Sequence, residues 1–244
     1  MSIEVRHVTV GGLRVEVVRK DIRNLHLGVY PPNGRVRVAA PLVISDDAVR
    51  LAVVDKLAWI KRQRAQFAKQ PRQSVREMVS GESHYFMGRR YRLRVHEQDG
   101  PAKVAVRGIA SIDLFVRPGT EQTQCEAVLQ RWYRQQLKAL IPLLLAKWQP
   151  LIGVDVEAWG IRRMKTKWGS CIPTSRRIWL NLELAKKSPA CLEYVLVHEL
   201  MHLHERHHNE QFVAMLDKHL PTWRAARDSL NAEPLRAENW AAAE

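Results

Sequence analysis

Two histidines and a glutamate are spaced for metal chemistry in the segment His198-Glu-Leu-Met-His202. Residues i and i+4 of an α-helix lie on one face about one turn apart, so both imidazoles can reach one metal ion. The carboxylate of Glu199 would project beside that ion, where it can take a proton from metal-bound water and pass it to a leaving group. The pattern predicts a hydrolase with one Zn²⁺ ion and Glu199 as general base.

The residues around this segment are apolar on nearly every side, which predicts a buried helix: Val195-Leu-Val197, Leu200-Met201 and Leu203. Two imidazoles and a carboxylate are costly to bury unless a partner satisfies them, and a metal ion does so. A purely structural zinc site is the alternative. Structural sites favour four ligands and usually include cysteines, so the pattern favours a catalytic ion.

A catalytic zinc ion usually takes three protein ligands, and the residues alone leave the third one open. The candidates are His204, His207, His208 or a downstream carboxylate. His204 is two positions beyond His202 and would face away on the same helix. His207 and His208 lie where this helix should end and the next begin, so the chain can fold back toward the metal there.

The elements that must position these residues are mostly helical. A capping hydroxyl and a proline, Ser188-Pro189, predict a helix start, and the helix should run to about Arg206. Another should begin at Asn209 and stop near Pro221. Two strands are expected before them, at 154–159 and 177–182. A long apolar stripe predicts a helix over 121–147, which Pro142 should kink or divide.

The N-terminal part alternates apolar and polar residues, as β-strands do. Strands are expected at 8–10, 13–17, 25–29, 36–38, 91–95, 104–106 and 112–116, with one helix from Ser45 to Arg64. The turn at Pro118-Gly119 marks a boundary. The sequence therefore predicts an α+β fold, in which a β-rich basic region (1–119) precedes a catalytic domain (120–244).

Several segments together resemble a known family. They are Met164-Lys-Thr-Lys-Trp-Gly-Ser-Cys171, Ile178-Trp-Leu-Asn181, Val197-His-Glu-Leu-Met-His202 with His208, and upstream Gly34–Val38, Pro41, Lys56–Ile60 and Gly88–Tyr91. In this order they resemble the YgjP-like family of zinc metallopeptidases, related to SprT-like proteins, over roughly residues 25–225. The resemblance implies a zincin-like peptidase acting on a protein or peptide, with His208 as the third zinc ligand. One departure is His207, where the family often has Asn.

Three further residues are candidates for substrate contact. Gly169 and Ser170, in Trp168-Gly-Ser-Cys171, would lie near the cleft, where a glycine allows close backbone approach. The alternative, which the sequence favours, is a tight turn packed under the metal helix. Asn181 ends a strand that could pair with an extended substrate, as an edge strand does in zincins. Tyr133 could donate to an oxyanion, although an aromatic residue on such a helix usually belongs to the core.

The positive net charge of the chain is compatible with partners other than a protein substrate. The chain of 244 residues carries a net charge of +14, and residues 50–94 hold 12 Lys and Arg against 3 Asp and Glu. This basic region could bind nucleic acid, as in a nucleic-acid-associated protease of the SprT-like type, or could be a solvated face that serves solubility. A second alternative is a metal-dependent nucleoside-triphosphate pyrophosphohydrolase, with Arg163, Lys165 and Lys167 holding phosphates.

The compartment is expected to be the cytoplasm. Three cysteines, Cys125, Cys171 and Cys191, do not suggest a disulfide framework. The first residues show no apolar signal segment, and the most apolar run, Leu140–Ala146, is far shorter than a membrane span. No membrane partner is therefore expected.

Overall fold

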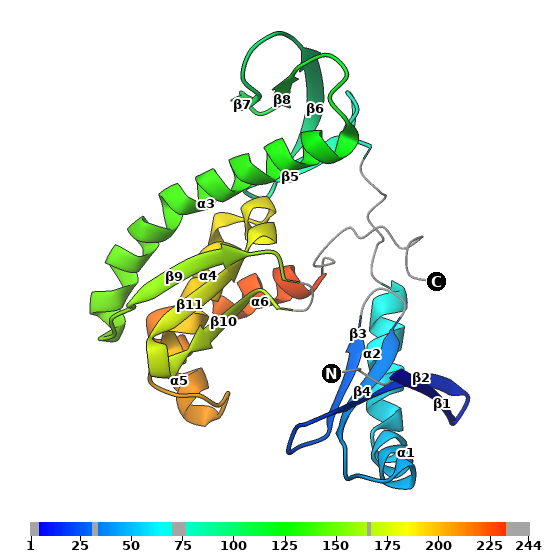
Figure 1. Cartoon of the computed structure of the whole chain (residues 1–244). Helices are drawn as coiled ribbons and strands as arrows, with labels where there is room; N and C mark the ends of the chain where they lie inside the picture. Colours follow the sequence, from blue (N-terminus) through cyan, green and yellow to red (C-terminus); the bar gives the residue numbers. More distant parts are fainter. Residues whose placement is uncertain (1–4, 31–33, 70–76, 165–166, 233–244) are drawn as a thin grey trace. The chain divides into compact units, whose positions relative to one another are not determined.

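A computed structural model describes residues 5–30, 34–69, 77–164 and 167–232 (Figure 1). The chain forms two compact units, Met1–Pro71 and Arg72–Glu244, each with its own core. Helices and strands are mixed, and four strands open the chain, so the α+β fold with a β-rich N-terminal region is confirmed. Among the described residues, no helix has the length and apolarity that a membrane span requires.

The first unit is a four-stranded sheet with two helices. Its elements are β1 (Val5–Val10), β2 (Leu13–Lys20), β3 (His26–Tyr30), β4 (Arg35–Pro41), α1 (Asp46–Asp55) and α2 (Leu57–Lys69). The strand order is β1-β2-β4-β3, in which two antiparallel pairs are joined by the parallel pair of β2 and β4. Val15 and Val38 of the sheet are fully buried in one core with Val53 and Ile60 of the helices.

The helix expected from Ser45 to Arg64 is divided in two. Ser45 caps α1 as expected, because its hydroxyl accepts a hydrogen bond from the backbone N–H of Ala48 at 3.2 Å. The helix ends at Asp55, and Lys56 leaves the helical conformation. This break turns the chain so that Leu57 and Ile60 of α2 pack on the same core as Val53.

The second unit begins with another four-stranded sheet. Its strands are β5 (Ser83–Phe86), β6 (Arg89–Glu97), β7 (Lys103–Arg107) and β8 (Ser111–Val116). The order β5-β6-β8-β7, with a parallel central pair, repeats the plan of the first sheet. Leu93 and Leu114 share a core with Trp132 of the helix that follows. These strands, which we grouped with the N-terminal region, therefore belong to the second compact unit.

A single long helix, α3 (Gln122–Ile152), follows this sheet. Figure 1 shows it continuous from end to end, so the division expected at Pro142 is wrong. Leu137, Ile141 and Leu145 lie buried along it, on both sides of the proline. Packing of this apolar stripe outweighs the backbone hydrogen bond that a proline removes.

A three-stranded sheet and three helices complete the unit. They are β9 (Ala158–Arg162), β10 (Gly169–Ile172), β11 (Arg177–Asn181), α4 (Pro189–Met201), α5 (Glu210–His219) and α6 (Trp223–Ala232), with 3₁₀ turns at Pro173–Ser175 and Leu182–Lys186. The order is β10-β11-β9, so β11 is central and β10 lies at an edge. Helix α4 packs against α3, β10, β11, α5 and α6, which makes it the central helix of the unit.

Candidate metal centre

Helix α4 carries the metal-binding pattern and is buried almost all round. The Ser188 hydroxyl accepts from the N–H of Cys191 at its start, and Pro189 occupies the first turn, as expected. Val197, Leu200 and Met201 are fully or nearly fully buried. The helix ends at Met201 rather than near Arg206, and in the turn that follows it the N–H groups of Leu203 and His204 donate to the carbonyl oxygens three residues back, those of Leu200 and Met201. This early end frees the chain to return toward α4.

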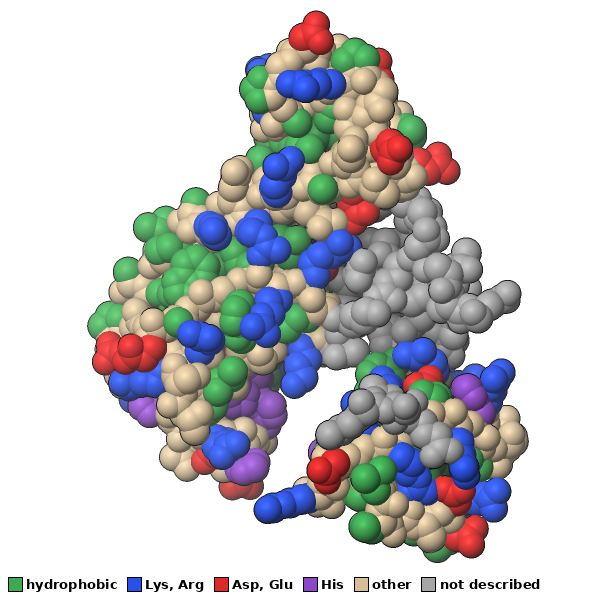
Figure 2. Space-filling view, in the orientation of Figure 1, with side chains coloured by type: hydrophobic (Ala, Val, Ile, Leu, Met, Phe, Trp, Pro, Cys, Tyr) green, Lys and Arg blue, Asp and Glu red, His purple; other side chains and the backbone are tan. Residues whose placement is uncertain are grey.

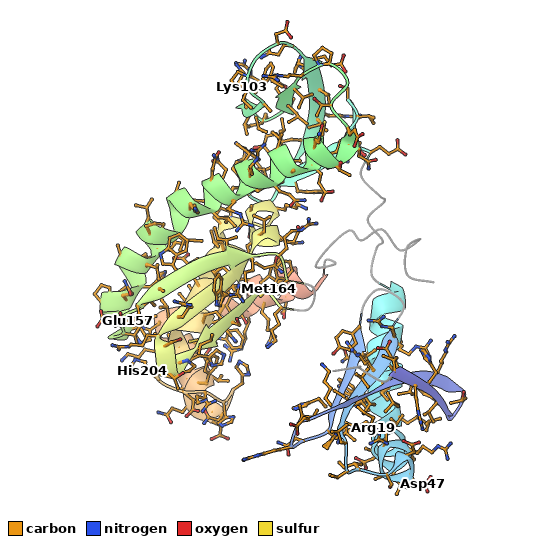
Figure 3. The ribbon with its side chains drawn as sticks, in the orientation of Figure 1. Arg19, Asp47, Lys103, Glu157, Met164 and His204 are labelled. Carbon is orange, nitrogen blue, oxygen red and sulfur yellow. The ribbon has the colours of Figure 1, made fainter. Side chains whose placement is uncertain are left out.

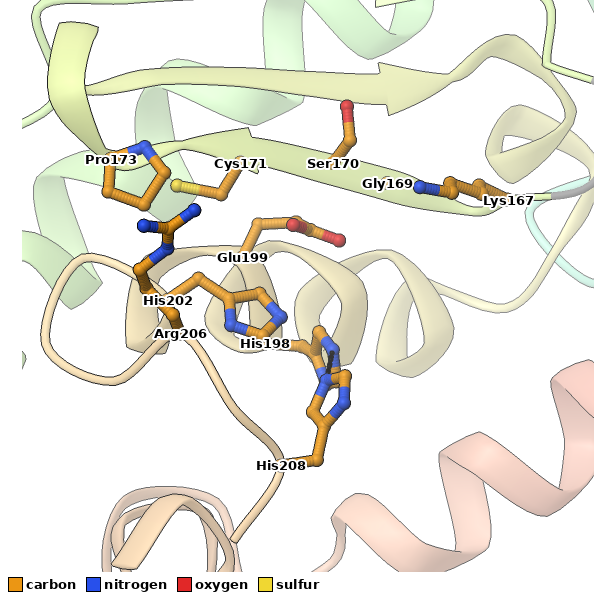
Figure 4. Close-up of a pocket in the computed structure, with 10 residues that line it drawn as sticks. All are labelled: Lys167, Gly169, Ser170, Cys171, Pro173, His198, Glu199, His202, Arg206 and His208. Atoms are coloured by element: carbon orange, nitrogen blue, oxygen red, sulfur yellow. Dashed lines mark hydrogen bonds between the residues drawn. The ribbon is translucent and has the colours of Figure 1, made fainter. Parts of the chain in front are cut away.

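Three imidazoles converge at this end of α4. One ring nitrogen from each of His198, His202 and His208 lies within 4.8 Å of the others. The Nε2 atoms of His198 and His208 face each other at 2.9 Å, and Figure 4 shows this pair with His202 beside it. The ring of Phe212 from α5 contacts all three imidazoles, with centroid distances of 4.8 to 4.9 Å. The i, i+4 spacing thus brings both helix histidines to one point.

Hydrogen bonding and burial favour the neutral, metal-binding form of two of these imidazole rings. The Nδ1 atom of His202 lies 3.0 Å from the carbonyl oxygen of Glu205, so Nδ1 donates and Nε2 is left with its lone pair free. Burial, with the neighbouring imidazoles, lowers the pKa of His198 to about 3 and also lowers the pKa of His202. Both rings are therefore neutral near pH 7, which is the form that binds metal.

His208 reaches the other two because a turn precedes α5. Asn209 caps α5 by accepting a hydrogen bond from the N–H of Phe212 at 3.0 Å. The other histidines lie elsewhere. The Nε2 atom of His204 contacts the carbonyl oxygen of Ile152 at 3.0 Å, at the end of α3 (Figure 3), and His207 is exposed. Among the candidates for the third position that lie in the described residues, the structure brings only His208 into the trio.

Glu199 lies on the side of α4 that faces β10. Its side chain is almost completely buried, and burial raises its pKa to about 8, against the opposing effect of the nearby Lys167. The strand passes so close that a Cβ atom on Gly169 would lie 2.5 Å from Glu199 Oε1. Glycine at 169 therefore makes room for this carboxylate.

The other substrate candidates take different places. In the segment Trp168–Cys171, expected as a turn, the residues from Gly169 onward instead belong to β10, and Figure 4 shows Ser170 pointing away from the imidazoles. Asn181 is fully buried at the end of the central strand. Its amide donates to the carbonyl oxygens of Met164 and Lys167 at 2.9 and 2.8 Å. The expectation that Asn181 ends an edge strand is wrong, because β11 is central and the edge strand beside the histidines is β10.

A cleft of about 340 Å³ opens over the trio between β10 and the end of α4 (Figure 4). Its lining residues are Lys167, Gly169, Ser170, Cys171, Pro173, His198, Glu199, His202, Arg206 and His208. Figure 2 shows histidine side chains gathered on the surface near α5, where the site meets solvent. Sequence reasoning missed Arg206. Its position between His202 and His208, in the segment that returns toward α4, is the signal that could have suggested it.

Two other expectations concern basic and aromatic groups. Arg163 pairs with Glu126 at 3.2 Å, and Lys165 lies outside the described residues, so Lys167 is the member of the expected phosphate-binding set that lines the cleft. The hydroxyl of Tyr133 donates to the carbonyl oxygen of Tyr85 at 2.7 Å, and the residue is buried in the core. Tyr133 is thus a core residue rather than an oxyanion donor.

The family model of the YgjP-like metallopeptidase domain matches residues 23–233. The chain belongs to the YgjP-like family. This YgjP-like match spans both compact units and includes all three histidines and Glu199. It supports a metal-dependent peptidase, a hydrolase that uses a divalent metal ion. No curated protein matches the chain.

Proposed function

We propose that this YgjP-like chain is a zinc-dependent peptidase. In this proposal His198, His202 and His208 hold one Zn²⁺ ion, and Glu199 is the general base. The observation that carries the proposal is the meeting of three imidazoles and a buried carboxylate in one cleft beside an edge strand.

The donor set fits zinc. Three imidazole nitrogens with one open position form the usual protein contribution to a catalytic zinc site. The Nε2 atoms of His198 and His208 face each other across 2.9 Å, an arrangement that a shared cation would satisfy. A bound zinc ion would supply Lewis acidity and lower the pKa of water.

Glu199 would move the proton. The pKa of about 8 belongs to the metal-free chain, where burial disfavours the charged carboxylate; beside the positive charge of a zinc ion the carboxylate would ionise, take a proton from water and then release it to the leaving amine. Its position is fixed by the rigid α4 backbone on one side and by Gly169 of β10 on the other. Fixing the base in this way removes the entropic cost of orienting it.

Strand β10 would hold the substrate. In the described part of the chain it pairs with β11 on one side only, so its other edge offers free backbone groups along the cleft. An extended peptide can add to such an edge by backbone hydrogen bonds, which places a peptide bond next to Glu199. Gly169 would then act by close approach, with Ser170 contributing backbone rather than side-chain contact.

The test is the Glu199→Gln variant. It removes the base but preserves shape, so we expect normal zinc content and a loss of peptide hydrolysis of roughly 10²- to 10⁴-fold. Metal analysis and cleavage of a proteome-derived peptide mixture measure the two effects. Equal turnover by the variant would contradict the proposal. Phosphate release from nucleoside triphosphates, lost on chelation, would instead favour the pyrophosphohydrolase alternative, for which Lys167 and Arg206 in the cleft are the available cations.

A further inference from the structure

A second pocket adjoins the metal cleft. It has a volume of about 230 Å³ and shares Lys167, Gly169, His198 and Glu199 with that cleft. Its remaining lining residues come from the start of the β10 segment, from α4 and from α6: Trp168, Tyr194, Val195, Arg227 and Leu230. Because four residues line both cavities, the pocket opens directly beside Glu199. It is thus placed to receive a side chain of a residue next to the reacting bond.

The walls of this pocket are apolar. Tyr194, Val195 and Leu230 are buried residues, and Trp168 packs against the same core. The ring of Tyr194 stacks on Trp223 of α6, with centroids 6.0 Å apart, and meets the edge of His198 at 5.7 Å. These contacts fix the wall between the histidines and α6. An aliphatic stem would therefore be well packed there.

The charges in this pocket are mainly positive. Lys167 and Arg227 contribute two cations, and Glu199, the proposed base, is the single carboxylate among the lining residues. Arg227 lies 5.0 Å from the Trp223 ring and pairs with the next residue, Asp228, at 2.9 Å. Both members of that pair are substantially exposed, so water screens it and the guanidinium can exchange its partner at little cost.

We propose that this pocket selects an acidic side chain, glutamate foremost, in the substrate residue next to the reacting peptide bond, with Arg227 as the specificity-determining residue. This rests on the proposed peptidase function. A glutamate side chain is complementary to both features of the pocket: its short aliphatic stem can pack against the apolar walls, and its carboxylate can pair with the guanidinium. A lysine or arginine side chain would meet two like charges.

Arg227 is the better residue to change. Lys167 lies close enough to Glu199 to lower its pKa, so a variant there would alter the base as well as the pocket. Arg227 comes from α6 and is not among the residues that line the metal cleft. Arg224, on the same helix, pairs with Asp217 and lines neither cavity, which makes Arg224→Gln the matched control.

The first experiment measures binding without turnover. Two peptidyl hydroxamates, which chelate zinc, would differ only in a glutamate or glutamine side chain, and their affinities for the zinc-loaded full chain would be measured by calorimetry. We expect the glutamate compound to bind at least about 10-fold more tightly. This preference should vanish in Arg227→Gln, largely persist in Arg227→Lys and be unchanged in Arg224→Gln. Equal affinities in the wild-type chain, or a preference that survives in Arg227→Gln, would overturn the proposal.

The second experiment separates the pocket from the reaction. Peptides that vary one position at a time as Glu, Gln, Leu or Lys would be tested for cleavage by the wild-type chain and by Arg227→Gln. Glutamate beside the cleaved bond should raise kcat/KM in the wild-type chain alone. Cleavage without this preference would contradict the proposed specificity of the pocket but not the proposed peptidase function. Absence of cleavage, with the hydroxamate preference intact, would contradict the peptidase function but not the specificity of the pocket.

Discussion

Gly169 limits how the proposed base is held. A Cβ atom at this position would lie 2.5 Å from Glu199 Oε1, so Gly169→Ala must push the carboxylate away from β10. We expect unchanged zinc content and a fall in kcat/KM on the order of 10²-fold, because a misplacement of about 1 Å has effects of that size. Zinc analysis and peptide cleavage measure the two quantities.

The matched control is Gly160→Ala in β9 of the same sheet. There a Cβ atom would crowd the ring of Trp179 instead of Glu199. If Gly160→Ala lowered kcat/KM as much as Gly169→Ala, general disturbance of the sheet would explain the loss. The steric role of Gly169 would then be refuted.

Titration of two buried groups should determine how the stability of the metal-free chain depends on pH. The pKa of Glu199 is raised to about 8, so the folded chain holds a proton that the unfolded chain releases near pH 4.5. The free energy of unfolding should therefore fall as the pH rises from 4.5 to 8, by at most about 1.4 kcal/mol per pH unit. The pKa of His198 is lowered to about 3, so stability should also fall as the pH drops from 6.5 to 3.

These opposite slopes predict that the metal-free chain is most stable between about pH 4.5 and 6.5. Urea unfolding of chelator-treated protein across this range measures it. Glu199→Gln should remove the fall above pH 6.5 and leave the acid limb in place. A wild-type curve that rises between pH 6.5 and 8 would contradict the assignment.

The site residues differ in how far the sequence predicts them. The i, i+4 rule places His198 and His202 on one face, and the structure brings them together. The third histidine depends on where α4 ends and how the turn before α5 returns, which are long-range features that spacing does not encode. The edge position expected for the strand of Asn181 was wrong because spacing does not encode strand order, and only the order β10-β11-β9 shows that this strand is central.

At the scale of elements, the turn between α4 and α5 holds the trio together. Asn209 directly follows His208 and caps α5 through its bond to the N–H of Phe212. Asn209→Ala should cost about 1 kcal/mol of stability. It should also weaken zinc binding, by about 10-fold, because outer contacts that orient ligands affect affinity on that scale.

Ser45→Ala provides the comparison. It removes an equivalent cap from α1, in the first unit, where Ser45 accepts from Ala48 N–H. A similar stability loss is expected there, with zinc affinity unchanged. Thermal unfolding and competition with a chromophoric chelator measure the two effects. If both variants bound zinc like the wild-type chain, the cap of α5 would have no part in orienting His208.

Element types were better predicted than element limits. The helices at Ser188 and Asn209 begin where their caps indicate, because capping is a local interaction. The break at Lys56 and the continuity of α3 through Pro142 depend on packing against distant residues of the two cores, and the end of α4 at Met201 depends on a turn that helical spacing does not indicate. Gly169–Ile172 is a similar case, since four residues that begin with a glycine form a strand only because β11 pairs with them.

At the scale of the whole molecule, the basic residues are distributed over both units. The basic region at 50–94 includes parts of α1 and α2 in the first unit and of β5 and β6 in the second. Figure 2 shows Lys and Arg side chains spread over the visible face rather than gathered in one area. Nucleic-acid binding through this region stays a prediction. The division into functional parts at residues 119 and 120 also stays a prediction, because the two compact units are defined by their contacts and not by their functions.

A net charge of +14 nevertheless predicts attraction to polyanions. We expect the chain to bind duplex DNA near 50 mM salt, with an affinity that falls steeply and linearly in a log–log plot against salt concentration, because each contacted phosphate releases counterions. Fluorescence anisotropy at several salt concentrations measures this slope. A flat response, or no binding near 50 mM salt, would exclude a delivery role for the basic residues.

The repeated strand order has a consequence for how the protein folds during its synthesis. In each four-stranded sheet the last strand in the sequence forms the central parallel pair. The first sheet can therefore be complete once residue 41 has left the ribosome, and the second sheet once residue 116 has left it. The three histidines proposed as zinc ligands emerge only at residues 198 to 208. We therefore expect the ion to enter a nascent chain whose sheets are already folded, so that zinc shortage would leave a late, localised defect rather than a wholly unfolded product.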